Sequence, residues 1–228
     1  MSGRVVIVTG GTRGIGRALA EGYAAAGARV VAASRKPDAC KETEENLREI
    51  GAEALGVPTR MDDLDDLRML VAKTVDAFGR VDVVVNNAAN ALAQMMGEYT
   101  PEAWSKSLDV NLRGPVFLVQ EALPHLKKSE HAAVLNVLSG AAFLFSSTVS
   151  LYGIGKAGLM AATRSGVSPP CSWRRSGPTS STTRSTSASS GSTRTATVPI
   201  LPRAACAKLR AWSKFRWRGL LSKNTSPT

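Results

Sequence analysis

The stretch Val5-Val6-Ile7-Val8-Thr9-Gly10-Gly11-Thr12-Arg13-Gly14-Ile15-Gly16 decides the fold of this chain. Four consecutive aliphatic residues bounded by glycine are typical of a short strand buried on both faces. The glycines let the backbone turn sharply and approach a ligand closely, because no Cβ stands in the way. A helix that begins near Gly14 then directs its N-terminal N–H groups toward the same place, which suits a diphosphate. A tight turn without a ligand is the alternative.

The sequence after this stretch alternates predicted strands and helices. Hydrophobic runs and their bounding glycines predict strands at 29–33, 53–58, 81–87 and 132–138, and helices at 38–50, 62–78, 100–128 and 150–165. Pro115 should bend the long helix. The connections are too long for hairpins, so we expect a parallel sheet with helices on both faces. This is the α/β, three-layer αβα, doubly wound Rossmann-type architecture.

Polar residues follow several of the predicted strands. Ser34-Arg35 come after the second strand, Asn86-Asn87 after the fourth, and Ser139 after the fifth. Ligands of doubly wound sheets bind outside the carboxyl ends of the strands, where the strand order reverses. We therefore expect these residues to lie at the same edge of the sheet as the glycine turn.

Tyr152 and Lys156 are four residues apart at the start of a predicted helix, so their side chains share one face. A phenol is a poor proton donor or acceptor at neutral pH, because its pKa is about 10. A neighbouring cation stabilises the phenolate and lowers that pKa. With Ser139 as a hydrogen-bond donor to the same substrate oxygen, the pair indicates a general acid/base for alcohol–carbonyl interconversion. Taken alone, Tyr-x-x-x-Lys is also a common accident.

Five motifs occur in order between residues 3 and 165. They are Thr9-Gly10-Gly11-Thr12-Arg13-Gly14-Ile15-Gly16, Asn86-Asn87-Ala88-Ala89, Asp109-Val110-Asn111-Leu112, Asn136-Val137-Leu138-Ser139 and Tyr152-Gly153-Ile154-Gly155-Lys156. On these motifs the chain resembles the short-chain dehydrogenase/reductase (SDR) family. Members of that family are Rossmann-fold, NAD(P)(H)-dependent oxidoreductases. Ala89 stands where the family usually has glycine.

The resemblance implies a role for each matched residue. Tyr152 would exchange a proton with the substrate oxygen, and Ser139 would orient that oxygen. Lys156 would lower the tyrosine pKa and hold the nicotinamide ribose, and Asn111 would complete a proton relay through water. The substrate implied is a small secondary alcohol or ketone, and no metal is implied. The residues expected to bind the cofactor are Gly10, Thr12, Arg13, Gly14, Ile15, Gly16, Ser34, Arg35, Asn87, Ala88, Ala89, Tyr152 and Lys156.

The residues after the second strand indicate which cofactor is bound. An acid there would bind the 2′-hydroxyl of NAD, but this chain has Ser34-Arg35-Lys36. Arg35, helped by Arg13, could pair with a 2′-phosphate, so we favour NADP(H), with NAD(H) as the alternative. Both arginines could instead be solvated surface residues. Arg60 departs from the family, which usually has an acid or amide at this position in the adenine pocket.

The net charge of +11 is unevenly distributed over the 228 residues. All 18 acidic residues lie at or before Glu130, whereas residues 166–228 carry 11 of the 29 Lys and Arg residues and no acid. This basic segment is rich in Ser, Thr, Arg and Pro. It cannot bury enough apolar area to offset its ordering entropy, so we expect disorder. We therefore divide the chain into a Rossmann domain at 1–165, truncated at its C-terminal side, and a basic tail at 166–228.

The family continues beyond the Tyr-x-x-x-Lys helix with a sixth and a seventh strand, which shape the substrate pocket and much of the oligomer interface. We favour a translational frame change near Ser165 as the reason why the tail differs. Read one base over, Thr183-Arg184-Ser185 permits an Asn-Ala-Val/Leu sequence like that of the sixth strand. A genuine basic tail for nucleic acid or acidic membrane is the other explanation, which we do not favour.

The leading interpretation is an oxidoreductase that transfers hydride between NADP(H) or NAD(H) and a secondary alcohol or ketone. Activity of this form is in question, because the C-terminal strands are expected to be missing or disordered. The alternatives are a catalytically inactive dinucleotide-binding pseudo-enzyme and a basic-tail protein that binds nucleic acid or other anions. A homo-oligomer is typical of the family but is not favoured for this chain.

Cysteine, histidine and hydropathy patterns exclude other classes. Cys40, Cys171 and Cys206 form no Cys-x-x-Cys pair, and His125 and His131 do not share a helical face, so we expect no metal site. The same cysteine usage favours a reducing, cytoplasmic location. We expect no signal peptide and no transmembrane helix, since no apolar run reaches 18 residues.

Overall fold

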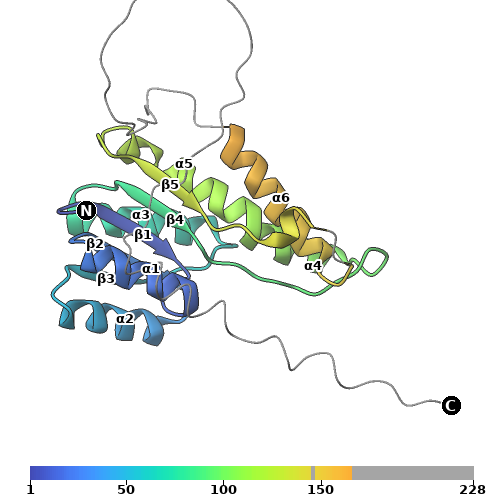
Figure 1. Ribbon diagram of the computed structural model, residues 1–228, viewed down its shortest axis with the longest axis horizontal. Coiled ribbons are helices and arrows are strands. Elements are labelled where there is room, and N and C mark those ends of the chain that lie inside the picture. The colour runs from blue at the N-terminus through green and yellow to red at the C-terminus, as the bar shows by residue number, and fades with distance from the viewer. Residues whose placement is uncertain (145–146, 166–228) are drawn as a thin grey trace, which may run out of the picture.

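The computed structural model describes residues 1–144 and 147–165 (Figure 1). The predictions for residues 166–228, namely the disordered basic tail, its frame change and the missing C-terminal strands, lie outside the described residues.

Five parallel strands form one sheet at the centre of the described chain. Their order in the sheet is β3-β2-β1-β4-β5. Adjacent pairs are all parallel. The chain thus moves outward from β1 in one direction and then returns to the other side, so the strand order reverses between β1 and β4. The strands are β1 (Val5–Thr9), β2 (Arg29–Ser34), β3 (Ala54–Pro58), β4 (Val83–Asn86) and β5 (Ala133–Asn136).

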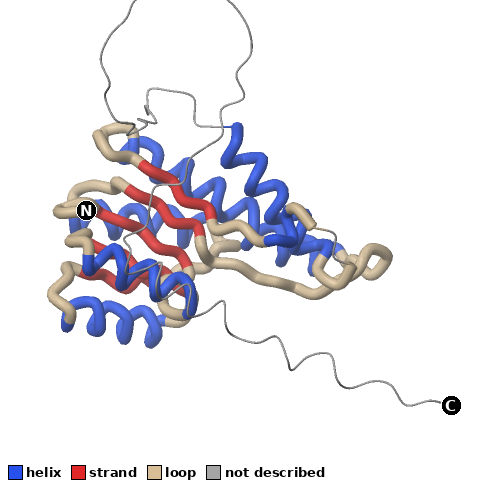
Figure 2. Tube along the Cα trace, viewed as in Figure 1, coloured by secondary structure: helices blue, strands red, loops and turns tan. Residues whose placement is uncertain are grey.

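Helices cover both faces of this sheet (Figures 1 and 2). They are α1 (Gly14–Ala25), α2 (Pro37–Glu49), α3 (Leu64–Phe78), α4 (Pro101–Leu108), α5 (Gly114–Leu126) and α6 (Ser150–Ser165). Val6 and Val8 of β1 pack in one core cluster with apolar residues of α1 and α2. Val5 and Ile7 pack in the other, with residues of α3 and α5. Successive strand residues therefore face opposite helical layers, and the predicted three-layer fold is confirmed.

The helix predicted at 100–128 is present as three consecutive helical segments. They are α4, a π-helical segment η1 (Asp109–Arg113) and α5. The backbone keeps helical dihedral angles at Leu108, Asp109, Arg113 and Gly114. The Gly114 N–H donates to the Asp109 carbonyl, five residues back, which is the wide spacing of a π-turn. The irregularity of this helix is therefore a π-turn directly before Pro115, which the sequence did not predict.

The two outermost described strands on the β5 side differ in burial. Every residue of β4 is buried, whereas every residue of β5 is only half-buried. Within the described part of the chain β5 pairs with β4 alone, so its other edge carries no strand. The sheet is therefore well covered around β1 and β4 and less covered at β5.

Candidate active site

The glycine turn after β1 is packed tightly against the protein. A Cβ on Gly16 would lie 2.0 Å from the Gly10 carbonyl oxygen, and one on Gly11 would lie 2.8 Å from the Val8 carbonyl oxygen. Gly10 has a φ of 64°, which favours glycine. Gly14 also has a positive φ, of 53°, but a Cβ there would meet nothing within 4 Å. The turn is therefore closed toward the sheet and open at Gly14.

Thr9 and Asn87 join the glycine turn to the end of β4. The Thr9 hydroxyl accepts from the backbone N–H groups of Asn87 and Ala88 at 3.0 and 3.1 Å and donates to the Val85 carbonyl at 3.2 Å. The Asn87 amide nitrogen donates to the Thr9 carbonyl at 2.9 Å and to that of Gly10 at 3.3 Å. These bonds bring together two segments almost 80 residues apart in sequence.

Sequence reasoning quoted Thr9 only as part of the motif and gave it no role. The signal was a threonine at the end of an otherwise aliphatic strand, and its side chain is 1% exposed. A buried hydroxyl needs hydrogen-bond partners, so such a threonine indicates a backbone contact from another segment.

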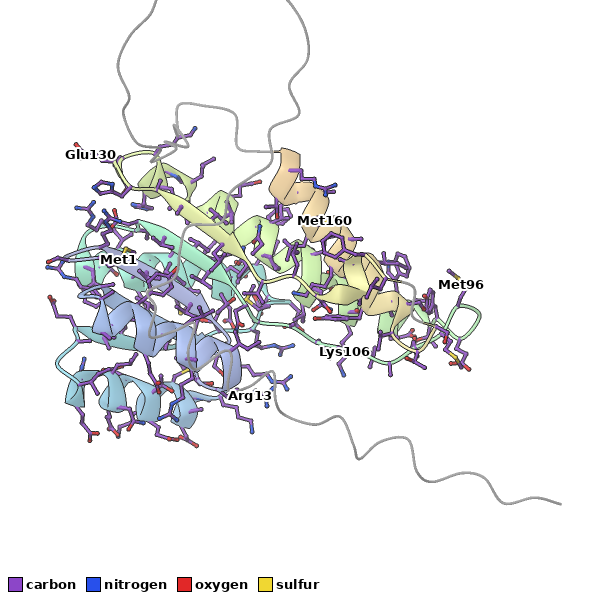
Figure 3. All side chains as sticks on the ribbon, viewed as in Figure 1. Met1, Arg13, Met96, Lys106, Glu130 and Met160 are labelled. Atoms are coloured by element: carbon purple, nitrogen blue, oxygen red, sulfur yellow. The ribbon has the colours of Figure 1, made fainter. Side chains whose placement is uncertain are left out.

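The N-terminus of α1 carries no capping side chain and no acid in its first turn. By contrast, α3 is capped by Asp63 and α4 by Thr100. The first N–H groups of α1, which begins at Gly14, can therefore bind an anion from outside the helix. Arg13 precedes this helix and is exposed. Figure 3 shows Arg13 at the edge where the strands end, with Met1 and Glu130 at the opposite edge.

The remaining predicted cofactor residues lie on the same edge. Thr12 is half-buried in the turn and Ile15 is exposed on the first turn of α1. Ser34 ends β2, and Arg35 follows it with an exposed side chain. Ala88 is half-buried and Ala89 exposed, directly after β4 and Asn87. The predicted set thus occupies the ends of β1, β2 and β4.

Asn111 is fully buried within the π-helical segment η1. Its amide nitrogen donates to the Asn90 carbonyl at 2.7 Å and to the Ser107 hydroxyl at 3.2 Å, and its oxygen accepts from the Asn90 N–H at 3.0 Å. A Cβ on Gly155 would lie 3.0 Å from the Asn111 Cβ. The residue therefore joins the loop after β4 to α6.

Lys156 is the largest of the fully buried side chains, at 1% exposed. Its ammonium donates to the Val137 carbonyl at 2.8 Å and lies 5.8 Å from the centroid of the Tyr152 ring. Burial lowers the pKa of Lys156 from 10.5 to about 8. The cation predicted beside the phenol is therefore present, and its environment is apolar enough to weaken its hold on a proton.

Ser139 begins the short 3-10 helix η2 (Gly140–Ala142), and its hydroxyl accepts from the Ala141 N–H at 3.3 Å. A Cβ on Gly153, next to Tyr152, would lie 2.8 Å from the Ala141 carbonyl oxygen. The segments that carry Ser139 and Tyr152 are therefore in contact. Within the described residues no hydrogen bond joins these two side chains directly.

The loop between β4 and α4 is connected to the start of α6, which sequence reasoning did not foresee. Gln94 forms a parallel bridge with Val149, and the Ser150 hydroxyl donates to the Gln94 carbonyl at 3.0 Å. The hydroxyls of Tyr99 and Ser150 are also hydrogen-bonded. Figure 2 shows this loop extending beyond the ends of the strands. It therefore lies on the side of the sheet that carries Tyr152.

The buried Asn86 and the half-buried Asn136 connect β4, β5 and α6. The Asn86 amide nitrogen donates to Asn136 Oδ1 at 2.8 Å, and Asn136 Nδ2 donates to the Thr163 hydroxyl at 2.8 Å. Across residues 1–144 and 147–165, Asn86 Oδ1 is one of two buried side-chain atoms without a partner. The pair holds β5, and thus Ser139, beside β4.

The described residues contain no helix long and apolar enough to span a membrane. In the same residues no three His, Cys, Asp or Glu side chains are grouped so that they could hold a metal ion.

The fold of this chain is shared with known proteins. A family model described as short chain dehydrogenase matches residues 4–168, so the chain belongs to the short-chain dehydrogenase family. Two curated relatives match by sequence. An uncharacterized oxidoreductase of Thermotoga maritima is 36% identical over 165 residues, and tropinone reductase-like 3 of Erythroxylum coca is 34% identical over 163 residues.

These matches cover 72% and 71% of this chain, and they span 64% of the Thermotoga protein and 62% of the Erythroxylum protein. Two solved structures are also similar, each 28% identical and covering 72% of this chain. A metagenomic short-chain oxidoreductase in complex with NADP has a TM-score of 0.67 over 75% of its length. A Burkholderia phymatum short chain dehydrogenase/reductase in complex with NAD has a TM-score of 0.69 over 59% of its length.

Proposed function

We propose that this chain binds a nicotinamide dinucleotide, NADP(H) in preference to NAD(H), and interconverts a secondary alcohol and the matching ketone. The observation that carries the proposal is Lys156, fully buried with its ammonium 5.8 Å from the Tyr152 ring, at the sheet edge where the glycine turn opens. Similar structures hold NADP or NAD, which supports the class of cofactor. The exposed Arg13 and Arg35 support the preference for a 2′-phosphate.

In this proposal the chain's own residues bind, orient and move a proton. The open turn at Gly14 and the uncapped N-terminus of α1 hold the diphosphate. Lys156 stabilises the phenolate of Tyr152, so that the phenol gives a proton to a ketone oxygen or takes one from an alcohol. Ser139 orients that oxygen, and Asn111 supports the relay of the proton to solvent. The nicotinamide supplies or accepts the hydride at the substrate carbon.

The test is a titration of the purified full chain with NADPH and NADH, followed by nucleotide fluorescence, and a turnover assay on simple ketones. Wild type should bind NADPH more tightly than NADH. Tyr152→Phe keeps the ring but loses the hydroxyl, so NADPH binding should weaken far less than turnover, which should fall at least a hundredfold because the proton donor is lost. Turnover retained in Tyr152→Phe would contradict the assigned role.

A dinucleotide-binding protein without turnover is the second candidate. It is favoured by the half-buried β5 and by the exposure of Phe143 and Leu144, 63% and 72%, which follow η2. Tight NADPH binding in the wild type with no turnover on any ketone tested would support this candidate. Binding of neither nucleotide would contradict both.

A further inference from the structure

Arg60 lies next to the predicted 2′-phosphate site, although the family pattern places an acid or amide there. The register pairs Ser34 of β2 with Pro58 of β3, and the Thr59 N–H donates to the Ser34 carbonyl at 2.8 Å. Arg35 and Arg60 therefore follow adjacent ends of two paired strands. Both side chains are exposed at the edge of the sheet where the glycine turn lies.

The two carboxylate oxygens of Asp62 each accept a hydrogen bond from the Arg60 guanidinium. Arg60 Nε donates to Asp62 Oδ1 at 3.3 Å, and Nη2 donates to Oδ2 at 3.0 Å. The Arg60 backbone N–H also donates to Asp66 Oδ2 at 2.7 Å. A guanidinium has five N–H donors, so three remain uncommitted in the described structure. The side chain is 64% exposed, so these donors are within reach of a ligand.

Arg35 acts on the same carboxylate. The pKa of Asp62 is lowered, first by the hydrogen bond from Arg60, against the effect of burial, and further by the charges of Arg60 and Arg35. Asp62 in turn raises the pKa of the Arg60 guanidinium, and the charges of Asp63 and Asp66 raise it further. Since these carboxylates already face the Arg60 charge, the guanidinium would meet a 2′-phosphate mainly through its three uncommitted N–H donors.

We propose that Arg60, oriented by Asp62, is a further specificity residue that binds the 2′-phosphate of NADP(H) together with Arg35. This inference rests on the proposed binding of a nicotinamide dinucleotide. A fixed, planar fork loses little freedom when it meets a phosphate, which suits Arg60 to this task. Asp62 is a positioning residue, since it acts through the guanidinium.

The experiment titrates the full chain and its Arg60→Gln variant with NADPH, NADH, 2′,5′-ADP and 5′-AMP, using nucleotide fluorescence and calorimetry. Loss of a charge-assisted contact should weaken NADPH and 2′,5′-ADP roughly tenfold, and change NADH and 5′-AMP less than about twofold. Arg35→Gln should do the same. Arg68→Gln on α3 is the matched control, because that exposed guanidinium pairs with Asp65 of the same helix and with Glu121 of α5, and its loss should leave all four affinities unchanged.

The outcomes separate the two proposals. Equal weakening of the 2′-phosphorylated and unphosphorylated nucleotides by Arg60→Gln would overturn the inference, since the contact would then be to their common part. The inference would also be overturned if Arg60→Gln unfolds as wild type does and keeps all four affinities, while Arg35→Gln loses affinity for NADPH. Arg60→Lys keeps the positive charge but not the planar guanidinium, and it should recover part of the affinity lost in Arg60→Gln. Such a recovery would show that the loss does not come from misfolding. A wild type that binds no nucleotide contradicts the proposed function itself, and with it the role of Arg60.

Discussion

In the N-terminal part of the molecule, residues 5–86, the central strands β1 and β4 are better buried than β5 of the C-terminal part, residues 133–165. Every residue of β1 and β4 is buried, whereas every residue of β5 is half-buried. The glycine turn follows β1, and Ser139 lies shortly after β5. Since burial of apolar area stabilises the fold, each residue of β1 and β4 should contribute more to the free energy of folding than a residue of β5.

Substitution of Gly16 should lower stability the most, because this glycine is packed very tightly against the backbone of Gly10. In Gly16→Ala the new Cβ would lie 2.0 Å from the Gly10 carbonyl oxygen and 2.4 Å from Asn87 Nδ2. The turn must open, so we expect the free energy of unfolding to fall by about 3 kcal/mol or more, and NADPH binding to be lost. Urea denaturation and fluorescence titration measure both.

The control for this variant is Gly14→Ala. Its Cβ enters open space at a φ of 53°, so only backbone strain of about 1 kcal/mol is expected. Equal losses of stability in the two variants would contradict the idea that close packing, rather than backbone conformation, makes Gly16 necessary.

Asp82 stabilises the opposite, amino end of the sheet in the N-terminal part. Its fully buried carboxylate accepts from the Val5 N–H at 2.9 Å, from Arg80 and from the Ser129 hydroxyl. In Asp82→Asn an amide nitrogen would face one of these donors, so we expect a loss of about 2 kcal/mol at pH 7, measured by urea denaturation. Asp76→Asn, at an exposed acid of α3, should change little.

The effect of Asp82→Asn should depend on pH. Burial alone would raise the pKa of Asp82, but hydrogen bonds from Arg80, Ser129 and Val5 lower it below 3.8 overall. A carboxyl whose folded pKa is lowered contributes stability above its unfolded pKa and loses it as pH falls through the folded value. The gap between wild type and Asp82→Asn should therefore narrow below about pH 4. A gap that widens at low pH would contradict this assignment.

Val84 and Val134 test the comparison directly, because they are register partners on β4 and β5. Val84 is fully buried, whereas Val134 is only partly buried against the same core cluster. Val84→Ala should cost about 2 kcal/mol and Val134→Ala about 1 kcal/mol or less. Chemical denaturation of the two variants under one condition decides the point. Equal costs would mean that β5 is as well packed as β4.

The contribution of Lys156 to stability should change only at alkaline pH. Its pKa is lowered by burial to about 8, against 10.5 when exposed. Below pH 8 the lysine is protonated in both the folded and the unfolded chain, so the cost of burying its charge is fully present. Between pH 8 and 10.5 the folded chain releases the proton first, and wild type should gain stability as pH rises.

Lys156→Met lacks this titration. Relative to Lys156→Met, wild type should gain about 2 to 3 kcal/mol between pH 7 and pH 10, in urea denaturation at each pH, because the folded and unfolded pKa values are about 8 and 10.5. Parallel stability curves for wild type and variant over this range would show that the buried lysine keeps its proton.

The sequence predicted the fold well because the relevant signals are local. The aliphatic run Val5-Val6-Ile7-Val8 and the glycines after it predict a buried strand and a turn, and both are present. The long helix was predicted over nearly its whole range, but the π-turn within it was not, because η1 also contacts segments far away in the sequence. The bonds of Thr9 to Asn87 and the Gln94–Val149 bridge also join distant segments, which no periodicity reveals.

The candidate site was predictable to a different degree. The motifs named the residues, and the structure places the predicted cofactor residues on one edge of the sheet, with Lys156 beside Tyr152. What each residue does remains a proposal, because a role depends on ligands and on protonation as well as on position. The ion pair of Arg60 with Asp62 was not predicted either, because the sequence showed only that Arg60 departs from the family pattern.

The π-helical segment η1 has the effect of one residue inserted into a turn of an otherwise regular helix. One extra residue per turn shifts the helix phase by about 100°, so α4 and α5 present faces that an uninterrupted helix would not combine. With this phase Asn111 meets Asn90, while Gly114 meets the Met61 carbonyl so closely that a Cβ there would lie 2.1 Å away. The length of this segment is therefore constrained together with the identities of Asn111 and Gly114. A deletion of one residue between 109 and 113 would keep the helix but rotate α4 relative to α5 by about 100°, away from its packing against α6.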